Sequence, residues 1–151
     1  MPKYQSTKTY NHEVGLTACF RQWKADSHCR FLHGYALKVK LTFETSELDV
    51  RNWAVDFGSL KSVKGFLEDW FDHKTLVAED DPEMKIFSEL HWRNIIDMRV
   101  VPATGCEKFA EFIYEYVDGW LSDAGYAPRC KLVSVEVAEH GGNSALYFGE
   151  E

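Results

Sequence analysis

The side chains with the most reactive chemistry in this sequence lie between residues 28 and 33. Cys29 and His33 are four residues apart in a polar, irregular stretch, and His28 directly precedes the cysteine. A thiol beside a strand end can act as a thiolate or proton shuttle when its surroundings are partly exposed and electropositive. The thiol and imidazole could equally serve a metal site. The alternative is a buried thiol beside a surface histidine.

A second candidate is the pair Asp72 and His73, which follows a segment with helical periodicity. A carboxylate that accepts a hydrogen bond from an imidazole fixes its tautomer and raises its basicity. Adjacent residues seldom pair with each other directly, however. The alternative is a histidine that interacts favourably with the dipole at the end of a helix.

A third candidate is Glu139, which with His140 ends a predicted strand before a turn at residues 141–143. A carboxylate there can accept two N–H groups from a flat heterocycle, which gives orientation as well as affinity. The alternative is an ordinary solvated acid in a turn. Asp56 closes a short apolar segment and could simply begin a helix.

Hydrophobic periodicity predicts the elements that must position these side chains. Residues 4–24 are expected to be extended, 24–34 to form a loop, and 36–45 to form a strand with alternating apolar residues. Further segments follow: helices over 59–72, 81–91 and 104–125, the last with a Thr104/Glu107 capping box, and strands over 131–139 and 145–148. Residues 53–57 and 98–101 are expected to be short extended segments.

This order predicts an α+β fold with one domain, residues 1–151, in which helices cover one face of an antiparallel four-stranded sheet. The opposite face needs another cover or must be polar, which favours oligomerisation.

Composition narrows the class of protein. Hydrophobic content of 45% and aromatic content of 15% indicate a packed globular chain. The net charge of −7 argues against a nucleic-acid or acidic-membrane partner. No apolar run is long enough to span a membrane, and the polar start is no secretory signal, so we expect a cytoplasmic protein. The four cysteines include no Cys-x-x-Cys pair and are expected to be reduced thiols.

The order of these candidates resembles that of the 6-pyruvoyl- and 6-carboxytetrahydropterin synthase family. Cys29, His33 and Gly34 match the family's Cys-x-x-x-His-Gly-His signature, except that Tyr35 replaces the second histidine. Four more segments resemble family motifs in the same order: Val55–Lys61, Phe71–Leu76, Cys106–Ala110 and Glu139–Tyr147.

The resemblance implies a tunnelling fold, with trimers that close a barrel and usually a homohexamer with active sites at subunit interfaces. It implies a lyase acting on a pterin such as 7,8-dihydroneopterin triphosphate. Glu139 would hold the pterin ring and Glu107 would also be a substrate-binding residue. Cys29, Asp72 and His73 would be the catalytic residues that move protons.

The resemblance also implies zinc, which the family binds through three histidines. Here His33 is retained, while Tyr35 and Phe20 occupy the other two positions. His12 or His28 could serve as partners for His33, because tetrahedral zinc needs three protein ligands. The sequence therefore leaves zinc binding open. Two alternatives to the lyase stay open with it: a pterin-binding or altered-chemistry homologue without zinc-dependent activity, and a homologue of the fold with unrelated ligands.

Overall fold

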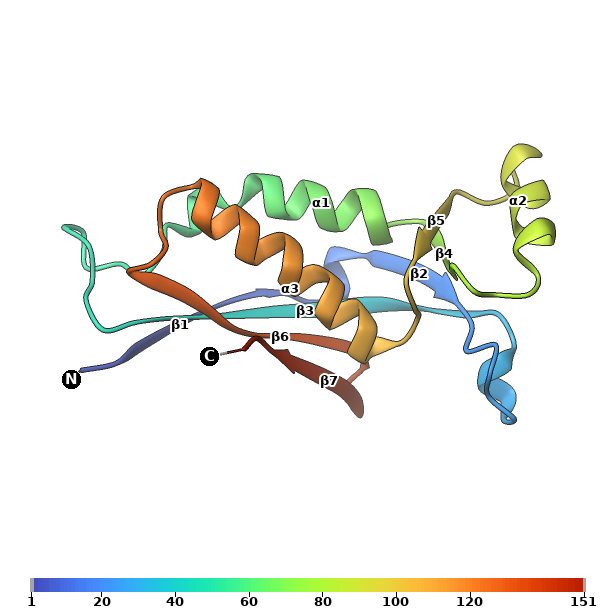
Figure 1. The fold of residues 1–151 in the computed structure, drawn as a ribbon, viewed down its shortest axis with the longest axis horizontal. Coiled ribbons are helices and arrows are strands. Elements are labelled where there is room, and N and C mark those ends of the chain that lie inside the picture. The colour runs from blue at the N-terminus through green and yellow to red at the C-terminus, as the bar shows by residue number, and fades with distance from the viewer. Residues whose placement is uncertain (1, 151) are drawn as a thin grey trace.

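The computed structural model describes residues 2–150, which form a mixed seven-stranded sheet with helices packed on one face (Figure 1). The strand order is β5-β4-β2-β3-β6-β7, and β1 pairs with β3 beside β2. The strands are β1 (Tyr4–Tyr10), β2 (Leu16–Phe20), β3 (His33–Thr45), β4 (Lys74–Ala78), β5 (Met98–Val101), β6 (Cys130–His140) and β7 (Asn143–Phe148). The helices are α1 (Lys61–Phe71), α2 (Met84–Trp92) and α3 (Cys106–Asp123), with 3-10 turns η1 (His12–Val14), η2 (His28–Arg30) and η3 (Phe57–Ser59).

Strand β3 is the centre of the sheet. One edge of β3 pairs with β2 over residues 33–37 and with β1 over residues 39–45, and its other edge pairs with β6. All three pairings are antiparallel, so the antiparallel arrangement predicted for this part of the chain is confirmed. The alternating residues Leu37, Val39, Leu41 and Phe43 are fully buried beneath the helices, which explains the period of two in the sequence.

Helices α1 and α3 cover this apolar face, while α2 lies apart from them beyond the ends of β4 and β5 (Figure 1). The covering residues recur at helical spacing: Val63, Leu67 and Phe71 of α1, and Phe109, Ile113, Val117 and Leu121 of α3, are buried. Lys38 and Glu136 lie on the opposite face of the sheet and form an ion pair of 3.5 Å.

The sheet has seven strands where four were predicted. The segment Lys74–Ala78 was missed, the short segment 98–101 joins the sheet as β5, and residues 53–57, expected to be extended, form no strand. Residues 75–78 of β4 are all buried, so this strand has no polar alternation to reveal it. β4 pairs in parallel with both β2 and β5, which makes the sheet mixed. The predicted extended segment 4–24 was also too simple, since η1 and Gly15, at φ 83°, separate β1 from β2.

The predicted Thr104/Glu107 capping box was wrong. The N-cap of α3 is Gly105, whose φ of 112° favours glycine, and it makes no side-chain capping bond. The Thr104 hydroxyl instead donates to the carbonyl oxygen of Arg21, 2.8 Å away, and so connects the start of α3 to the end of β2.

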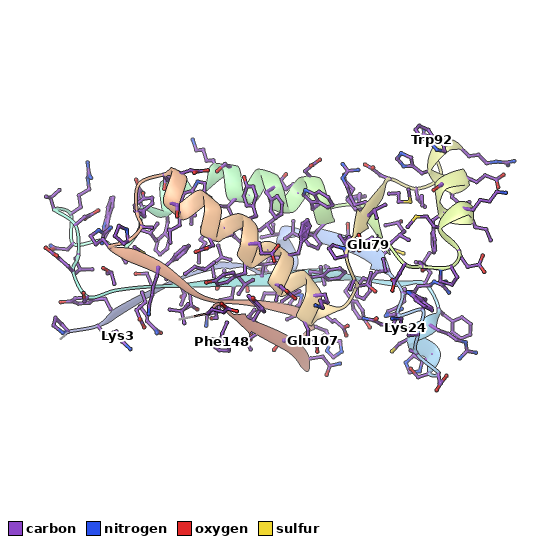
Figure 2. The ribbon with its side chains drawn as sticks, in the orientation of Figure 1. Lys3, Lys24, Glu79, Trp92, Glu107 and Phe148 are labelled. Atoms are coloured by element: carbon purple, nitrogen blue, oxygen red, sulfur yellow. The ribbon has the colours of Figure 1, made fainter. Side chains whose placement is uncertain are left out.

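All four cysteines are free, as predicted. Within residues 2–150, no helix has the length and apolar character needed to cross a bilayer. Figure 2 shows two contrasting helix ends: Trp92, which is 83% exposed, at the end of α2, and Glu107 in the first turn of α3.

Candidate functional site

Several predicted site residues gather where the helix-covered face of the sheet reaches the start of α3. Glu139 follows Val135 and Val137 at a spacing of two in β6, and Tyr35 precedes Leu37 at the same spacing in β3. Alternate residues of a strand share a face, so the core pattern itself turns both side chains towards α3. The polar residues Tyr35 and Glu139 therefore lie on the same face of the sheet as the buried core residues of β3 and β6.

Glu139 lies in a small polar cavity of about 210 Å³, lined by Gln22, Gly105, Cys106, Glu107, Glu139, Asn143 and Ser144. The side chains of Cys106 and Glu139 line this cavity together. Burial raises the pKa of Cys106 to about 12, and the negative charges of Glu139 and Glu107 add to this effect. Cys106 therefore stays a neutral thiol beside the carboxylate. Glu107 is exposed at the mouth of the cavity, within the positive end of the α3 dipole.

Cys29 is half-buried in η2 and is connected to this cavity through the backbone. Its carbonyl oxygen accepts a hydrogen bond of 2.9 Å from the N–H of Gln22, a residue that lines the cavity. Burial and the charges of Glu139 and Cys29 raise the pKa of Tyr35. Cys29 and Glu139 therefore both act electrostatically on Tyr35, a residue that the sequence had not singled out for the pocket.

Asp72 and His73 pair with each other directly, contrary to the expectation for adjacent residues. Oδ1 of Asp72 lies 2.6 Å from Nδ1 of His73, because the backbone of His73 has a φ of 57° that turns its side chain back. A non-glycine residue in this region costs free energy and is often found at functional sites. The ring donates through Nδ1, which leaves Nε2 free to exchange a proton.

Thr17 of β2 holds this pair in place and was not identified from the sequence. Its carbonyl oxygen accepts from the N–H of His73 at 2.7 Å, and its hydroxyl donates to Asp72 at 3.3 Å. The hydroxyl also lies 3.3 Å from Nδ1 of His73. A threonine in a strand gives no sequence signal for this role, since the contact depends on the parallel alignment of β2 with β4.

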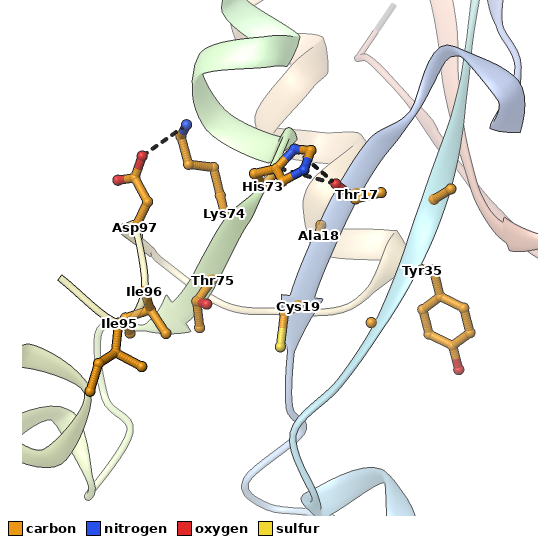
Figure 3. A pocket seen from close by; sticks show the side chains of 12 residues that line it. Thr17, Ala18, Cys19, Tyr35, His73, Lys74, Thr75, Ile95, Ile96 and Asp97 are labelled. Carbon is orange, nitrogen blue, oxygen red and sulfur yellow. Dashed lines mark hydrogen bonds and ion pairs between the residues drawn. The ribbon is translucent and has the colours of Figure 1, made fainter. Parts of the chain in front are cut away.

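His73 of this pair lines a second, larger cavity of about 500 Å³ (Figure 3). It is lined by Thr17, Ala18, Cys19, Gly34, Tyr35, Ala36, His73, Lys74, Thr75, Ile95, Ile96 and Asp97. Cys29 and Glu139 do not line this cavity. Within residues 2–150, no hydrogen bond or ion pair connects Cys29 to Asp72 or His73. One chain thus separates the predicted catalytic residues into two groups.

The three positions that the resemblance assigns to zinc ligands do come together in space. Phe20 lies opposite His33 in the β2–β3 register, and their ring centroids are 5.4 Å apart. Tyr35 is 5.4 Å from His33 and 6.2 Å from Phe20. Only the imidazole among these three rings is an ordinary zinc ligand.

The alternative partners for His33 do not complete a site. His12 points its Nδ1 at the carbonyl oxygen of Ala36, 2.5 Å away, and His28 is exposed in η2. Across residues 2–150 there is no group of three histidine, cysteine, aspartate or glutamate side chains that could hold a metal ion. The donor set of this chain therefore does not fit the zinc site that the resemblance implies.

Comparison with known proteins decides the family. Residues 9–150 match the family model of 6-pyruvoyl tetrahydropterin synthase. The chain belongs to this family. As a member of the 6-pyruvoyl tetrahydropterin synthase family, it falls among the pterin-pathway synthases, which confirms the resemblance found in its motifs.

Individual relatives agree with this assignment over the whole chain. The 6-carboxy-5,6,7,8-tetrahydropterin synthase of Aquifex aeolicus is 28% identical over 166 aligned positions, which cover 98% of this chain and 99% of the relative. An uncharacterized protein of Wolinella succinogenes has the same fold, with a TM-score of 0.83, 21% identity, and coverage of 99% of this chain and 100% of that one. Plasmodium falciparum 6-pyruvoyl tetrahydropterin synthase matches with a TM-score of 0.70 and 14% identity, covering 99% of both chains.

Proposed function

We propose that this protein is a lyase of the 6-carboxytetrahydropterin synthase type that acts on 7,8-dihydroneopterin triphosphate or a related reduced pterin. The observation that carries the proposal is the position of Glu139, a carboxylate in a small polar cavity. Gln22, which also lines this cavity, donates its backbone N–H to the carbonyl oxygen of Cys29. The N–H groups of a pterin ring match a carboxylate that accepts two hydrogen bonds. Family membership supports the substrate class.

In this proposal Glu139 anchors the pterin ring and Glu107 contributes to binding at the mouth of the cavity. Cys29 exchanges a proton with the substrate's side chain, a role supported by the hydrogen bond between its loop and Gln22, which lines the cavity. Cys106 lines the same cavity, and its neutral thiol can donate a hydrogen bond that keeps the Glu139 carboxylate oriented. These roles need the carboxylate ionised and the Cys106 thiol neutral, as its raised pKa ensures.

Asp72 and His73 act, in the same proposal, on the active site of a neighbouring copy. The His73 side chain is 85% exposed, and within residues 2–150 its Nε2 makes no hydrogen bond, so this nitrogen is accessible from outside the protomer. A homo-oligomer, a trimer or hexamer, would bring this pair to a partner's Cys29. The four free thiols suit a cytoplasmic location.

The test combines ligand binding with turnover. Glu139→Gln should weaken 7,8-dihydroneopterin binding, measured by calorimetry, by roughly 10- to 150-fold, since a hydrogen bond to a charged group contributes about 1.5–3 kcal/mol. Glu115→Gln is the matched control, because this exposed residue of α3 does not line the Glu139 cavity. Unchanged affinity of the Glu139 variant would refute the pocket.

Cys29→Ala tests the chemistry separately. We expect it to bind 7,8-dihydroneopterin as the wild type does and to lose turnover of 7,8-dihydroneopterin triphosphate. Wild-type turnover in this variant would remove Cys29 from the mechanism.

A second candidate function is a pterin-binding or altered-chemistry homologue. The replacement of two zinc-ligand positions by Phe20 and Tyr35 favours it, since zinc would supply a Lewis acid to the family's reaction. It predicts that the wild type binds the pterin but does not turn over 7,8-dihydroneopterin triphosphate.

A further inference from the structure

The three rings of Phe20, His33 and Tyr35, called here the ring cluster, lie on one face of two paired strands. Phe20 is directly opposite His33, and Tyr35 is two residues further along β3. Their mutual centroid distances are 5.4 to 6.2 Å, within the range of favourable aromatic contacts. The His33 and Tyr35 rings meet edge to face, at an interplanar angle of 87°.

The ring cluster is anchored in the hydrophobic core by Phe20. The Phe20 side chain is 1% exposed and packs edge to face on Phe109 of α3, with centroids 5.0 Å apart. A phenyl ring has no lone pair to offer a metal ion. Tyr35 carries a phenol, which is not among the usual side-chain ligands of zinc.

His33 by contrast keeps the orientation of a metal ligand. Its Nδ1 lies 2.7 Å from the carbonyl oxygen of Phe31, which can only accept, so Nδ1 carries the proton and Nε2 is left with its lone pair. A backbone carbonyl commonly fixes a ligating histidine in this way. The cluster therefore supplies one of the three protein ligands that a tetrahedral zinc site needs.

We propose that the ring cluster has replaced a metal centre, and that Phe20 and Tyr35 are the two residues that exclude zinc from it. Packing between the rings, instead of metal coordination, then holds the ends of β2 and β3 together. The Tyr35 hydroxyl, beside Glu139 and Cys29, then offers a neutral hydrogen-bond donor where a cation would otherwise be. This inference rests on the proposed function only in that the function identifies the cavity at Glu139 as the pterin pocket.

The first experiment measures metal content and needs no substrate. Wild type and His33→Ala are purified without an affinity tag, incubated with excess zinc, dialysed and analysed by plasma mass spectrometry. We expect the two proteins to hold the same low amount of zinc, and a chelator to leave the Tm of the wild type unchanged. About one zinc per chain in the wild type, lost in His33→Ala, would overturn the proposal.

The second experiment restores the ligands. The double variant Phe20→His/Tyr35→His should bind about one zinc per chain, and its cobalt complex should absorb visible light as tetrahedral sites do. Phe20→Leu/Tyr35→Phe is the matched control, with the same positions changed and no ligand added, and should bind none. A folded double variant that takes up no more zinc than this control would show that other features exclude the metal.

Because Phe20 is part of the core, the single variant Tyr35→His guards against misfolding of the double variant. It should bind zinc more weakly than the double variant and more strongly than the wild type. Binding equal to that of the wild type would contradict the assignment of Tyr35. None of these readouts depends on pterin binding or turnover, so failure here is distinguishable from failure of the proposed function.

Discussion

The Nδ1 of His73 lies 2.6 Å from Oδ1 of Asp72, although the two residues are neighbours in the sequence. The left-handed backbone of His73 makes this possible, and the backbone of Thr17 stabilises it by accepting from the His73 N–H. The pair is therefore preorganised before any substrate or partner arrives.

Thr17→Val should impair this pair without disturbing the strand, because valine keeps the shape and the carbonyl but lacks the hydroxyl. We expect kcat to fall roughly 10-fold with KM unchanged, the effect of losing a hydrogen bond of about 1.4 kcal/mol. Thr17→Ser, which retains the hydroxyl, should remain near wild type. Equal kcat values for the valine and serine variants would exclude a positioning role for the hydroxyl.

Gly34→Ala should destabilise the junction of β2 and β3. A Cβ at this position would lie 2.7 Å from the carbonyl oxygen of Ala18, which is rigid backbone. We expect a loss of about 1–3 kcal/mol in the free energy of unfolding, measured with urea. Gly65→Ala is the matched control: nothing lies within 4 Å of its Cβ position in α1, so this change should stabilise by about 0.5–1 kcal/mol. Equal effects of the two variants would contradict the close approach.

Asp81→Asn should be strongly destabilising. The Asp81 side chain is 2% exposed and accepts from Nη2 and Nε of Arg21 at 2.6 and 2.9 Å, so its loss leaves a largely buried guanidinium unpaired. We expect a loss of about 3 kcal/mol in thermal or urea unfolding. Asp80→Asn, in an exposed pair with Lys24, should cost less than about 1 kcal/mol.

The same pair predicts a pH dependence. Burial acts to raise the pKa of Asp81, but the hydrogen bonds from Arg21 and Glu83 outweigh it and lower the pKa below its ordinary value. The stabilisation is therefore fully present above the unfolded-state pKa of about 3.9 and is lost as the pH falls through the lower folded value. Urea midpoints of wild type and Asp81→Asn should converge as the solution is acidified, and a constant difference would contradict this origin.

Cys106 should resist alkylation at neutral and mildly alkaline pH. Burial raises its pKa to about 12, with Glu139 and Glu107 contributing, so little thiolate forms. Its stabilising contribution is fully present below the unfolded-state value of about 8.5 and is lost as the pH rises towards about 12. Peptide mapping after iodoacetamide treatment at mildly alkaline pH should find Cys106 unmodified in the folded protein and modified in urea. Rapid labelling in the folded state would show that Cys106 is not a buried thiol with a raised pKa.

The elements that could be predicted are those in which buried and exposed residues alternate along the sequence with the period of a strand or a helix. The alternation in β3 and the helical spacing of Val63 and Leu67 follow from one apolar face against one polar face. The segment Lys74–Ala78 could not be predicted as a strand in the same way, because β4 is covered on both sides and carries no alternation.

The residues of the candidate site could be identified from the sequence, but which of them lie together could not. Glu139 and Cys29 were identified from strand ends and motif spacing. Their separation from Asp72 and His73 depends on how β2 aligns with β4, which local patterns do not encode. Thr17 was missed for the same reason.

Strand β3 pairs with three other strands, and His33 and Tyr35 at its start belong to the ring cluster. Local opening of α2 or of the loop between β3 and η3 leaves these pairings intact, so the amide protons of central β3 should exchange with solvent only when the whole chain unfolds. The cluster is thus attached to the slowest-opening part of the molecule. Its geometry would persist through the fluctuations that admit or release a ligand, whereas the surfaces around it are free to move.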